Sequence, residues 1–296
     1  MGAIGVGRSG DRVFRAVNAV ILVAVCVATL FPFLNVIAVS LSGRNPVSRG
    51  EVSFYPKDFT LQAYKKILQN DAIFRAYGNT LFVVLVGTVL SVGMTAFAAY
   101  PLSKRNLVGR NAITFLFALT MWFSAGMIPQ FLVVRDLGLF DRLWALIMVP
   151  LVSAFHVIIM RTFFQTIPAS LEESAKIDGA NDAVVLFRIV MPLSKPVLAT
   201  VALWVAVFHW NTFMDPLIFL QTRSKFTLQL VLRDIILANS AMEYGMDVNP
   251  DMSEFEVVSE SVKYGTIIVA TLPILCLYPF LQKYFVQGVL IGSIKG

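Results

Sequence analysis

The chain of 296 residues is 57% hydrophobic and 14% charged, with a formal net charge of +6 and a mean hydropathy of +0.74. Soluble domains carry about a quarter charged residues, so this composition excludes an ordinary soluble enzyme and predicts an integral membrane protein. The basic residues are dispersed, and no basic patch interleaved with aromatics indicates nucleic-acid binding. A bilayer core requires about 20 apolar residues per helix, which leaves room for roughly six spans and their loops.

The N-terminal segment, residues 1–15, is rich in glycine and arginine. Gly5, Gly7 and Gly10 match the G-x-G-x-x-G spacing of a dinucleotide-binding loop. Such a loop follows a strand and opens a helix, whereas no strand pattern precedes these glycines and no βαβ unit surrounds them. We therefore expect a flexible tail without a nucleotide site.

The rest of the chain contains six long apolar runs, which predict an all-α membrane fold with six transmembrane helices. The predicted spans are residues 16–41, 78–102, 111–134, 143–160, 197–220 and 264–284. In the third span, Gly126 and Pro129 predict a break or a kink. The second span has a face of small residues that allows close approach of neighbouring helices. This face consists of Gly87, Ser91, Gly93, Ala96, Ala98 and Ala99.

Few side chains in the predicted spans can carry metal, redox or proton chemistry. Cys26 and Cys276 lie far apart in apolar runs, and we expect both to be buried as small hydrophobic residues rather than joined in a disulfide. The ionisable residues in the span interiors are His156, His209 and Asp215. Because ion-coupled carriers usually need buried carboxylates, this scarcity argues against such a carrier. No metal site is expected.

The longest polar interruption with helical character is residues 168–195, between the fourth and fifth predicted spans. We expect Ser170 to cap a short helix and Glu172 and Glu173 to offset the helix dipole in its first turn. Gly179 should end that helix, because glycine adopts a left-handed backbone without strain.

A second short helix is expected from about Asn181 to Ile189, ending before Pro192. Two short helices around a glycine would form a compact projection at the membrane surface. The residues alone leave two interpretations open, an ordinary amphipathic interfacial segment and a docking element for another protein.

The sequence of this segment resembles the EAA loop of ABC importer permeases, whose pattern is Glu-Ala-Ala, three residues, Gly, nine residues and Ile-x-Leu-Pro. The residues that match are Glu173, Ala175, Gly179, Ile189 and Pro192, while Ser174 and Met191 replace an alanine and the leucine. The resemblance implies the type I ABC importer permease fold, with both termini in the cytoplasm. Residues 16–284 would form the permease domain and residues 285–296 a second cytoplasmic tail.

Charge alone does not decide the orientation, because equal numbers of Lys and Arg fall on the two sides of this topology. The basic residues that crowd short segments beside spans nevertheless favour cytoplasmic termini by the positive-inside rule. These residues are Arg8, Arg12, Arg15, Lys104, Arg105 and Arg110.

The resemblance also implies a pore-forming subunit that is not itself an enzyme. The chain contains no Walker A sequence, so ATP and Mg would be bound by partner subunits. Expected partners are a second permease chain, two ATP-binding subunits, an extracytoplasmic binding protein, a sugar and membrane lipid, all at a bacterial inner membrane. The residues implied in coupling to the ATPase are Glu172, Glu173, Ser174, Ala175, Asp178, Gly179, Ile189 and Pro192. Alternatives are an ion-coupled secondary transporter and a membrane scaffold subunit without transport of its own.

The fifth predicted span contains Trp-Asn-x-Phe-x-x-Pro-Leu, which resembles a pattern of sugar ABC permeases. Aromatic faces and amide groups suit sugar C–H surfaces and hydroxyls. The candidate pathway residues are Trp204, Trp210, Asn211 and Asp215. Helix packing with an interfacial aromatic belt is the alternative for the aromatic residues, and capping of a kinked backbone is the alternative for Asp215. Related permeases include importers of acidic uronate oligosaccharides such as alginate, so the resemblance implies a neutral or acidic oligosaccharide.

Overall fold

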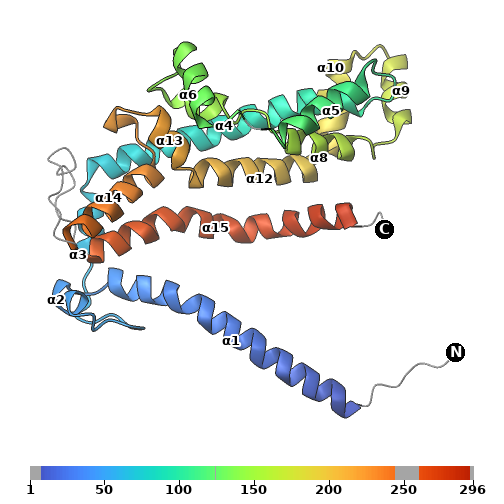
Figure 1. Cartoon of the computed structure of the whole chain (residues 1–296). Coiled ribbons are helices and arrows are strands. Elements are labelled where there is room, and N and C mark those ends of the chain that lie inside the picture. Colours follow the sequence, from blue (N-terminus) through green and yellow to red (C-terminus); the bar gives the residue numbers. More distant parts are fainter. Residues whose placement is uncertain (1–7, 124, 244–259, 294–296) are drawn as a thin grey trace. The chain divides into compact units, whose positions relative to one another are not determined.

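The computed structural model describes residues 8–123, 125–243 and 260–293, with side chains over residues 13–123, 125–237 and 260–276. Within these ranges every regular element is a helix, as the composition predicts (Figure 1). The chain divides into two compact units. One consists of Met1–Asn70 and Asp234–Ala270, and the other of Asp71–Arg233 and Thr271–Gly296.

The first unit is built on one long helix and two short ones. These are α1 (Arg8–Ser40), α2 (Arg44–Ser48) and α3 (Gln62–Leu68), joined by parts of α14 (Leu228–Glu243) and α15 (Glu260–Ser293). Its small core contains Ala38, Val39 and Val47, with Tyr264 packed against it. The Ser261 hydroxyl donates to the Ser42 carbonyl at 3.1 Å, which ties the start of α15 to the end of α1.

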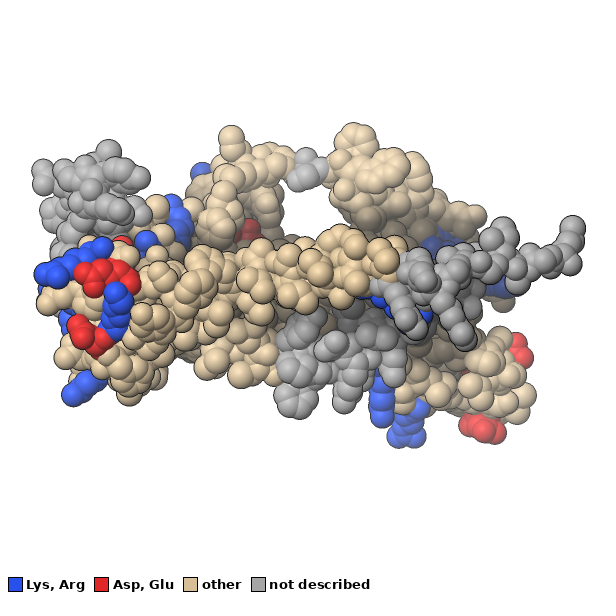
Figure 2. Space-filling view, turned by 90° about the horizontal axis from the view of Figure 1, so that it is seen from below, with Lys and Arg blue, Asp and Glu red and all other residues tan. Residues whose placement is uncertain are grey.

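Helix α1 presents an apolar surface that the rest of its own unit does not cover. From Val13 to Leu34 every side chain is exposed. In Figure 2 this surface is a tan band without charge, and charged side chains gather beyond it around α2. Cys26 and Cys276 are also exposed and free of disulfides, so the predicted burial of these cysteines is wrong. Apolar helices in a membrane protein face lipid, so an apolar side chain needs no protein cover.

The second unit is organised around α4 (Asp71–Ser103), which runs beside α8 and α12 (Figure 1). Its other helices are α5 (Arg110–Thr120), α6 (Met127–Asp136), α7 (Leu143–Met148), α8 (Ala154–Phe164), α9 (Ala169–Ile177), α10 (Asp182–Val185), α11 (Met191–Leu193), α12 (Lys195–Asn211) and α13 (Met214–Phe219). A π-helical turn, η1 (Leu186–Val190), joins α10 to α11, and a 3-10 turn, η2 (Arg223–Lys225), precedes α14.

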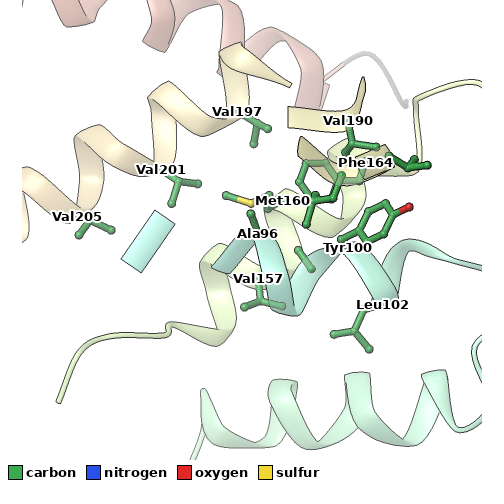
Figure 3. Packing of buried hydrophobic residues seen from close by; sticks show 13 residues of the cluster. Ala96, Tyr100, Leu102, Val157, Met160, Phe164, Val190, Val197, Val201 and Val205 are labelled. Carbon is green, nitrogen blue, oxygen red and sulfur yellow. The ribbon is translucent and has the colours of Figure 1, made fainter. Parts of the chain in front are cut away.

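The main core of this unit fills the space between α4, α8 and α12 (Figure 3). Ala96 and Ala99 on α4 leave room for the larger Met160 of α8 and Val201 of α12, and all four are buried. Gly87 and Ser91 of the predicted small-residue face are buried as well. The sequence thus identified the face on which α4 receives its neighbours.

Among the described residues, two helices have the length and hydropathy of transmembrane spans, Val13–Ser40 and Asp71–Ser103. There is a third candidate span if Asp182–Leu193 and Lys195–Asn211, which meet at an angle of 84°, count as one broken span. Helix α15 is continuous over the predicted sixth span and extends to Ser293, into the predicted C-terminal tail. At the N-terminus α1 begins at Arg8, inside the predicted flexible tail, and includes Gly10.

The predicted third, fourth and fifth spans are interrupted. The expected break in the third lies at Gly126, whose φ of +81° suits glycine, between α5 and α6. The fourth span was predicted as continuous but consists of α7 and α8, with Pro150 in the gap. Proline removes a backbone donor and clashes with the preceding turn, which explains the break. The fifth span divides into α12 and α13 after Asn211.

Candidate functional site

The polar loop of residues 168–195 folds as the two expected helices around a glycine, which together are called the knob below. Its first helix, α9, has Pro168 at the N-cap position, and Ser170 lies inside the helix, so the predicted Ser170 cap is wrong. Pro168 has an extended backbone (φ −58°, ψ 129°) that ends the preceding turn, and the helix starts two residues earlier than predicted. Glu172 lies in the first turn, as expected.

Glu172 is engaged within the chain. Its carboxylate forms an ion pair with the Lys104 ammonium, at the loop that follows α4, and only 14% of the Glu172 side chain is exposed. The same ammonium lies 4.1 Å from the ring centre of Tyr100, within the range of a cation–π contact. Lys104 is therefore held between α4 and the first turn of α9.

Gly179 ends α9 in the manner that the sequence predicts. Its φ is +84°, in the left-handed region. The Gly179 amide donates to the Lys176 carbonyl at 3.1 Å, and the Ala180 amide donates to the Ala175 carbonyl at 2.9 Å. These two bonds define a Schellman motif, in which glycine avoids the steric cost of a Cβ atom.

The second helix of the knob begins at an Asn181 cap, whose side-chain oxygen accepts from the Val184 amide at 2.9 Å. Lys176 and Asp182 form an ion pair of 2.8 Å across the glycine turn. The hydrogen bond to Asp182, with its negative charge, raises the pKa of Lys176. Both side chains are more than half exposed, so the pair adds little stability.

The helical path continues past Pro192, so the predicted end of the second helix before this proline is wrong. The chain passes from α10 through the π turn η1 into α11, which includes Pro192. A π turn widens the backbone by one residue and so accommodates a proline ring that would clash in a regular helix. The sharp bend comes two residues later, at buried Ser194.

The knob divides the residues of the predicted coupling set between two surfaces. Glu173, Ser174, Asp178, Gly179 and Pro192 are exposed. Ala175 and Ile189 are half-buried and pack against the main core, so they anchor the knob. An exposed residue outside the predicted set is Ile177, with 86% of its surface free. Its position four residues after Glu173, on the same helix face, could have identified it.

The predicted pathway residues of α12 fall on more than one face. Trp204 is half-buried and stacks on His156 of α8, with ring centres 5.8 Å apart and an interplanar angle of 20°. Asn211 lies seven residues further on the same helix face and is exposed, and its amide donates to the Val207 carbonyl at 2.9 Å. Phe208, between them at helical spacing, is also exposed. This aromatic and amide face on α12 is called the α12 stripe.

Trp210 and Asp215 lie apart from the α12 stripe. Trp210 is buried and makes an edge contact with Tyr77 of α4, with ring centres 5.9 Å apart. Asp215 is half-buried in the first turn of α13. The nearby His209 is 2% exposed, and a Cβ atom added to Gly87 of α4 would lie 2.6 Å from its Nε2 atom. Gly87 thus permits a close approach of α4 and α12 at His209.

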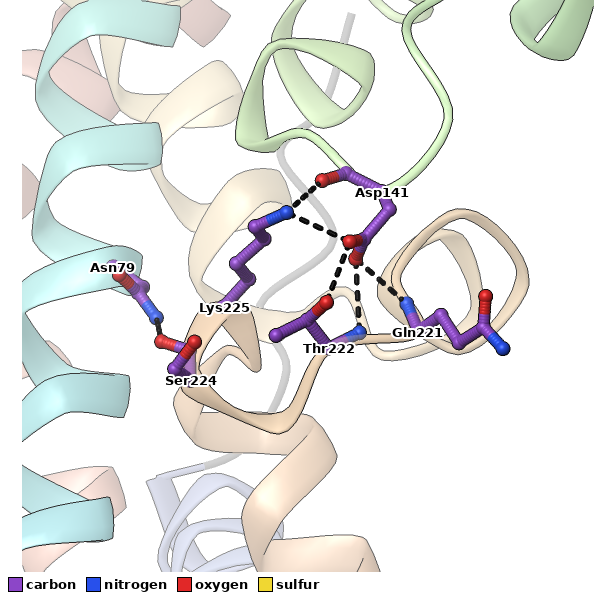
Figure 4. Close-up of polar contacts among 6 residues, drawn as sticks. All are labelled: Asn79, Asp141, Gln221, Thr222, Ser224 and Lys225. Carbon is purple, nitrogen blue, oxygen red and sulfur yellow. Dashed lines mark hydrogen bonds and ion pairs between the residues drawn. The ribbon is translucent and has the colours of Figure 1, made fainter.

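A polar cluster that the sequence did not indicate lies between the α6–α7 turn and the segment before α14 (Figure 4). The Asp141 carboxylate accepts hydrogen bonds from the backbone N–H of Gln221 at 3.0 Å and from the backbone N–H of Thr222 at 2.9 Å. It also accepts one from the Thr222 hydroxyl at 2.6 Å. It also forms an ion pair of 2.7 Å with Lys225. Nearby, the side-chain amide of Asn79 donates to the Ser224 carbonyl at 2.9 Å. Asp141 and the five-residue segment 221–225 are called the Asp141 cluster.

The bonds of this cluster set the charge of Asp141. Partial burial by itself would raise the pKa of the Asp141 carboxyl. The hydrogen bonds from Lys225, Thr222 and Gln221 outweigh it and hold this pKa well below its usual range. Asp141 has a φ of +55°, which aspartate and asparagine tolerate better than other residues with a Cβ atom. Over the described residues, no group of three His, Cys, Asp or Glu side chains could hold a metal ion.

Comparison with known proteins places this architecture in a family. Residues 1–291 match the family model of the binding-protein-dependent transport system inner membrane component. The polygalacturonan/rhamnogalacturonan transport system permease protein YtcP of Bacillus subtilis (strain 168) is 42% identical over 290 residues, which cover 97% of this chain and 99% of that protein. Protein LplC of the same strain is 42% identical over 285 residues, covering 96% of each chain.

A solved structure agrees with the sequence matches. It is the crystal structure of a bacterial ABC transporter involved in the import of the acidic polysaccharide alginate. The similar chain of that transporter has 36% sequence identity and a TM-score of 0.85, with 96% of this chain and 100% of that chain covered. The chain is therefore a multi-pass inner-membrane transport protein and belongs to the family of binding-protein-dependent transport system inner membrane components.

Proposed function

We propose that the chain is the permease subunit of an ATP-driven importer, with six membrane crossings and both termini in the cytoplasm. The observation that carries the proposal is the knob, a two-helix projection with an outward face of Glu173, Ser174, Ile177 and Asp178. A subunit without its own ATP site needs such an element to receive movement from an ATPase. ATP and Mg²⁺ bind to the partner ATPase subunits, and this chain holds neither.

The outward face of the knob suits a protein cleft. Ile177 supplies an exposed apolar side chain, and Glu173 and Asp178 supply carboxylates on either side of it. Charge-assisted hydrogen bonds to basic residues of the ATPase would fix the orientation of the joint, and burial of Ile177 would add affinity. Closure of the ATPase pair on ATP would then move the knob and drive alternating access of the permease.

We propose an acidic oligosaccharide as the substrate. Support comes from the relative named for polygalacturonan and rhamnogalacturonan transport and from the structure of the alginate importer. The α12 stripe adds aromatic rings at Trp204 and Phe208 and an amide at Asn211, which match sugar C–H faces and hydroxyls. The stripe accounts for the sugar class, and the acidic character rests on the relatives.

The proposed assembly contains a second permease chain, two ATPase subunits and an extracytoplasmic binding protein that delivers the sugar. The uncovered apolar surface of α1 leaves a long helix available for lipid or for the second permease. An ion-coupled carrier does not explain why an exposed knob interrupts the chain between two apolar segments. A scaffold could dock another protein on the knob, but it does not account for the similarity to proteins named for transport and import.

The test is uptake into liposomes that contain the complex purified through this chain from its native membrane, together with its binding protein. Short oligogalacturonates and alginate oligosaccharides are compared with uncharged maltooligosaccharides, with ATP inside the liposomes. We expect ATP-dependent uptake of an acidic oligosaccharide. Uptake driven by a proton gradient without ATP would establish a secondary carrier and overturn the proposal, and ATP-driven uptake of neutral sugars alone would refute the substrate class.

A further inference from the structure

A chain of contacts connects the knob to the Asp141 cluster through α4. At its C-terminal end α4 reaches the knob through the Lys104–Glu172 ion pair. At its N-terminal end the Asn79 amide donates to the carbonyls of Ser224 and Phe226 at 2.9 and 3.0 Å. Asn79 and Lys104 lie 25 positions apart and are joined by the continuous helix α4, which spans about 37 Å between them at 1.5 Å per residue.

The C-terminal end of α4 is a joint between several elements. The Leu102 carbonyl, an acceptor in the last turn, receives the guanidinium of Arg110 at 3.1 Å and that of Arg161 at 3.0 Å. These side chains come from α5 and α8. Cationic groups at a helix C-terminus satisfy its free carbonyls and offset the helix dipole. The end of α4 is thus fixed to α5 and α8, and Lys104 adds the link to α9.

The N-terminal end of α4 is fixed in a different way, by bonds to the backbone of one segment. Besides the two bonds from Asn79, the Leu228 amide donates to the buried Thr80 hydroxyl at 2.9 Å. The segment of residues 221–228 therefore cannot separate from α4 without losing three hydrogen bonds. Because the same segment carries Thr222 and Lys225, it also holds Asp141.

We propose that Lys104 is a positioning residue that couples the knob to α4, and that α4 carries the displacement as one rigid element to residues 221–228. The proposal rests on the function proposed above. It assigns the Glu172 carboxylate to the inside of the chain, where Lys104 occupies it, and leaves the exposed Glu173 and Asp178 for the ATPase. Lys104 then acts on transmission of movement and not on attachment of the ATPase.

The experiment uses the whole complex in lipid nanodiscs, where both membrane faces are accessible. Native Cys26 and Cys276 are replaced by serine, and the exposed Ser224 becomes the labelling site through Ser224→Cys. The rate of reaction with a polar maleimide is measured without nucleotide and after trapping with ATP, Mg²⁺ and vanadate. In the Lys104 wild-type background we expect nucleotide trapping to change this rate.

In Lys104→Ala we expect the ATPase to co-purify in the same amount and to hydrolyse ATP, while the nucleotide-dependent change in labelling falls at least about fivefold, the lower end of typical coupling between sites. Glu172→Gln should give the same loss, and the double variant should be no worse than either single one. Lys104→Arg, which keeps the charge, should restore the response. The matched control is Arg105→Ala, since Arg105 is the exposed neighbouring base.

Several other results would each contradict the role proposed for Lys104 or the proposed function. An unchanged response in Lys104→Ala, or an equal loss in Arg105→Ala, would overturn the transmission role. Loss of the ATPase from the Lys104→Ala complex would assign Lys104 to docking and also overturn it. Failure of Lys104→Arg to restore the response would show that the positive charge is not the cause. Absence of ATPase from the unmodified complex would instead refute the proposed function, so the two failures are distinguishable.

Discussion

The knob and the Asp141 cluster are two polar regions of the same unit that differ in how far along the chain their contacts reach. In the knob, the Schellman bonds, the Asn181 cap and the Lys176–Asp182 pair all join residues six or fewer positions apart. In the Asp141 cluster the partners are separated by 80 to 84 positions. Apart from the Lys104–Glu172 ion pair, whose partners are 68 positions apart, the knob can thus form from local preferences, whereas the Asp141 cluster needs the helices to be assembled first.

This difference predicts separate responses to substitution, because each region opens with its own local free energy. Amide hydrogen exchange, followed by mass spectrometry in two windows, distinguishes them. One window covers α9 and α10, and the other covers residues 219–226. A variant in one region should accelerate exchange in its own window and leave the other unchanged.

The largest effect is expected for Asp141→Ala. This variant removes a charged acceptor of several hydrogen bonds, and we expect a loss of about 3 kcal/mol in local stability, or roughly hundredfold faster exchange at residues 219–226. Asp141→Asn keeps an oxygen acceptor and a residue type that tolerates the positive φ, so it should lose less. Equal exchange in wild type and Asp141→Ala would show that the cluster does not hold this segment.

Acid should remove the same interaction in the unmodified chain. The pKa of Asp141 is lower in the folded state than in the unfolded chain, so its charge contributes stability that is fully present above about pH 4. That contribution should be lost as the pH falls below this value through the folded pKa. Unfolding midpoints of the purified protein from pH 6 down to pH 3 test this, with Asp141→Asn as the reference. A parallel acid dependence in that variant would exclude Asp141 as its source.

A somewhat smaller effect, confined to the knob, is expected for Gly179→Val. A β-branched side chain at φ +84° costs about 2 kcal/mol, or roughly thirtyfold faster exchange in the α9–α10 window. We expect the chain to insert normally but to retain less ATPase. Gly93→Ala is the control, since Gly93 has no positive φ and an added Cβ atom there meets nothing within 4 Å. Wild-type exchange in Gly179→Val would contradict the role given to this turn.

The smallest effect is expected for Asn181→Ala, which removes the cap of α10. Loss of the bond to the Val184 amide should cost about 1 kcal/mol, or roughly fivefold faster exchange at residues 182–185. Asn181→Ser, which retains a capping oxygen, should remain close to wild type. Acceleration at residues 219–226 in Asn181→Ala would show that the two regions open together, against the comparison drawn above.

The same distinction explains what the sequence could predict of the fold. The first two apolar runs and the break at Gly126 follow from composition and local backbone preference. The interruption at Pro150 was missed because the apolar run continues through it, although proline can break a helix. The π turn before Pro192 was missed because its geometry depends on Leu186 and Val190 being buried in the core, and a linear pattern does not show this.

In the candidate site, too, features set by neighbouring residues could be predicted from the sequence, and features set by long-range packing could not. Gly179 and Asn181 were recognisable because their roles depend on neighbouring residues. The partner of Glu172 is 68 positions away at Lys104, so no local pattern could show whether Glu172 binds inside the chain or on another subunit. Likewise, the aromatic pattern identified Trp204 and Trp210 together. Only the packing of the helices shows that Trp204 is half-buried on the α12 stripe, whereas Trp210 is buried against Tyr77.

The most direct test of the central proposal is the ATPase activity of the complex purified through this chain. It is measured with and without the binding protein loaded with an acidic oligosaccharide. We predict that an ATPase co-purifies, that the loaded binding protein raises its activity, and that Gly179→Val lowers the amount of ATPase retained while Gly93→Ala does not. A well-folded chain that is purified from its native membrane without any ATPase would contradict the account.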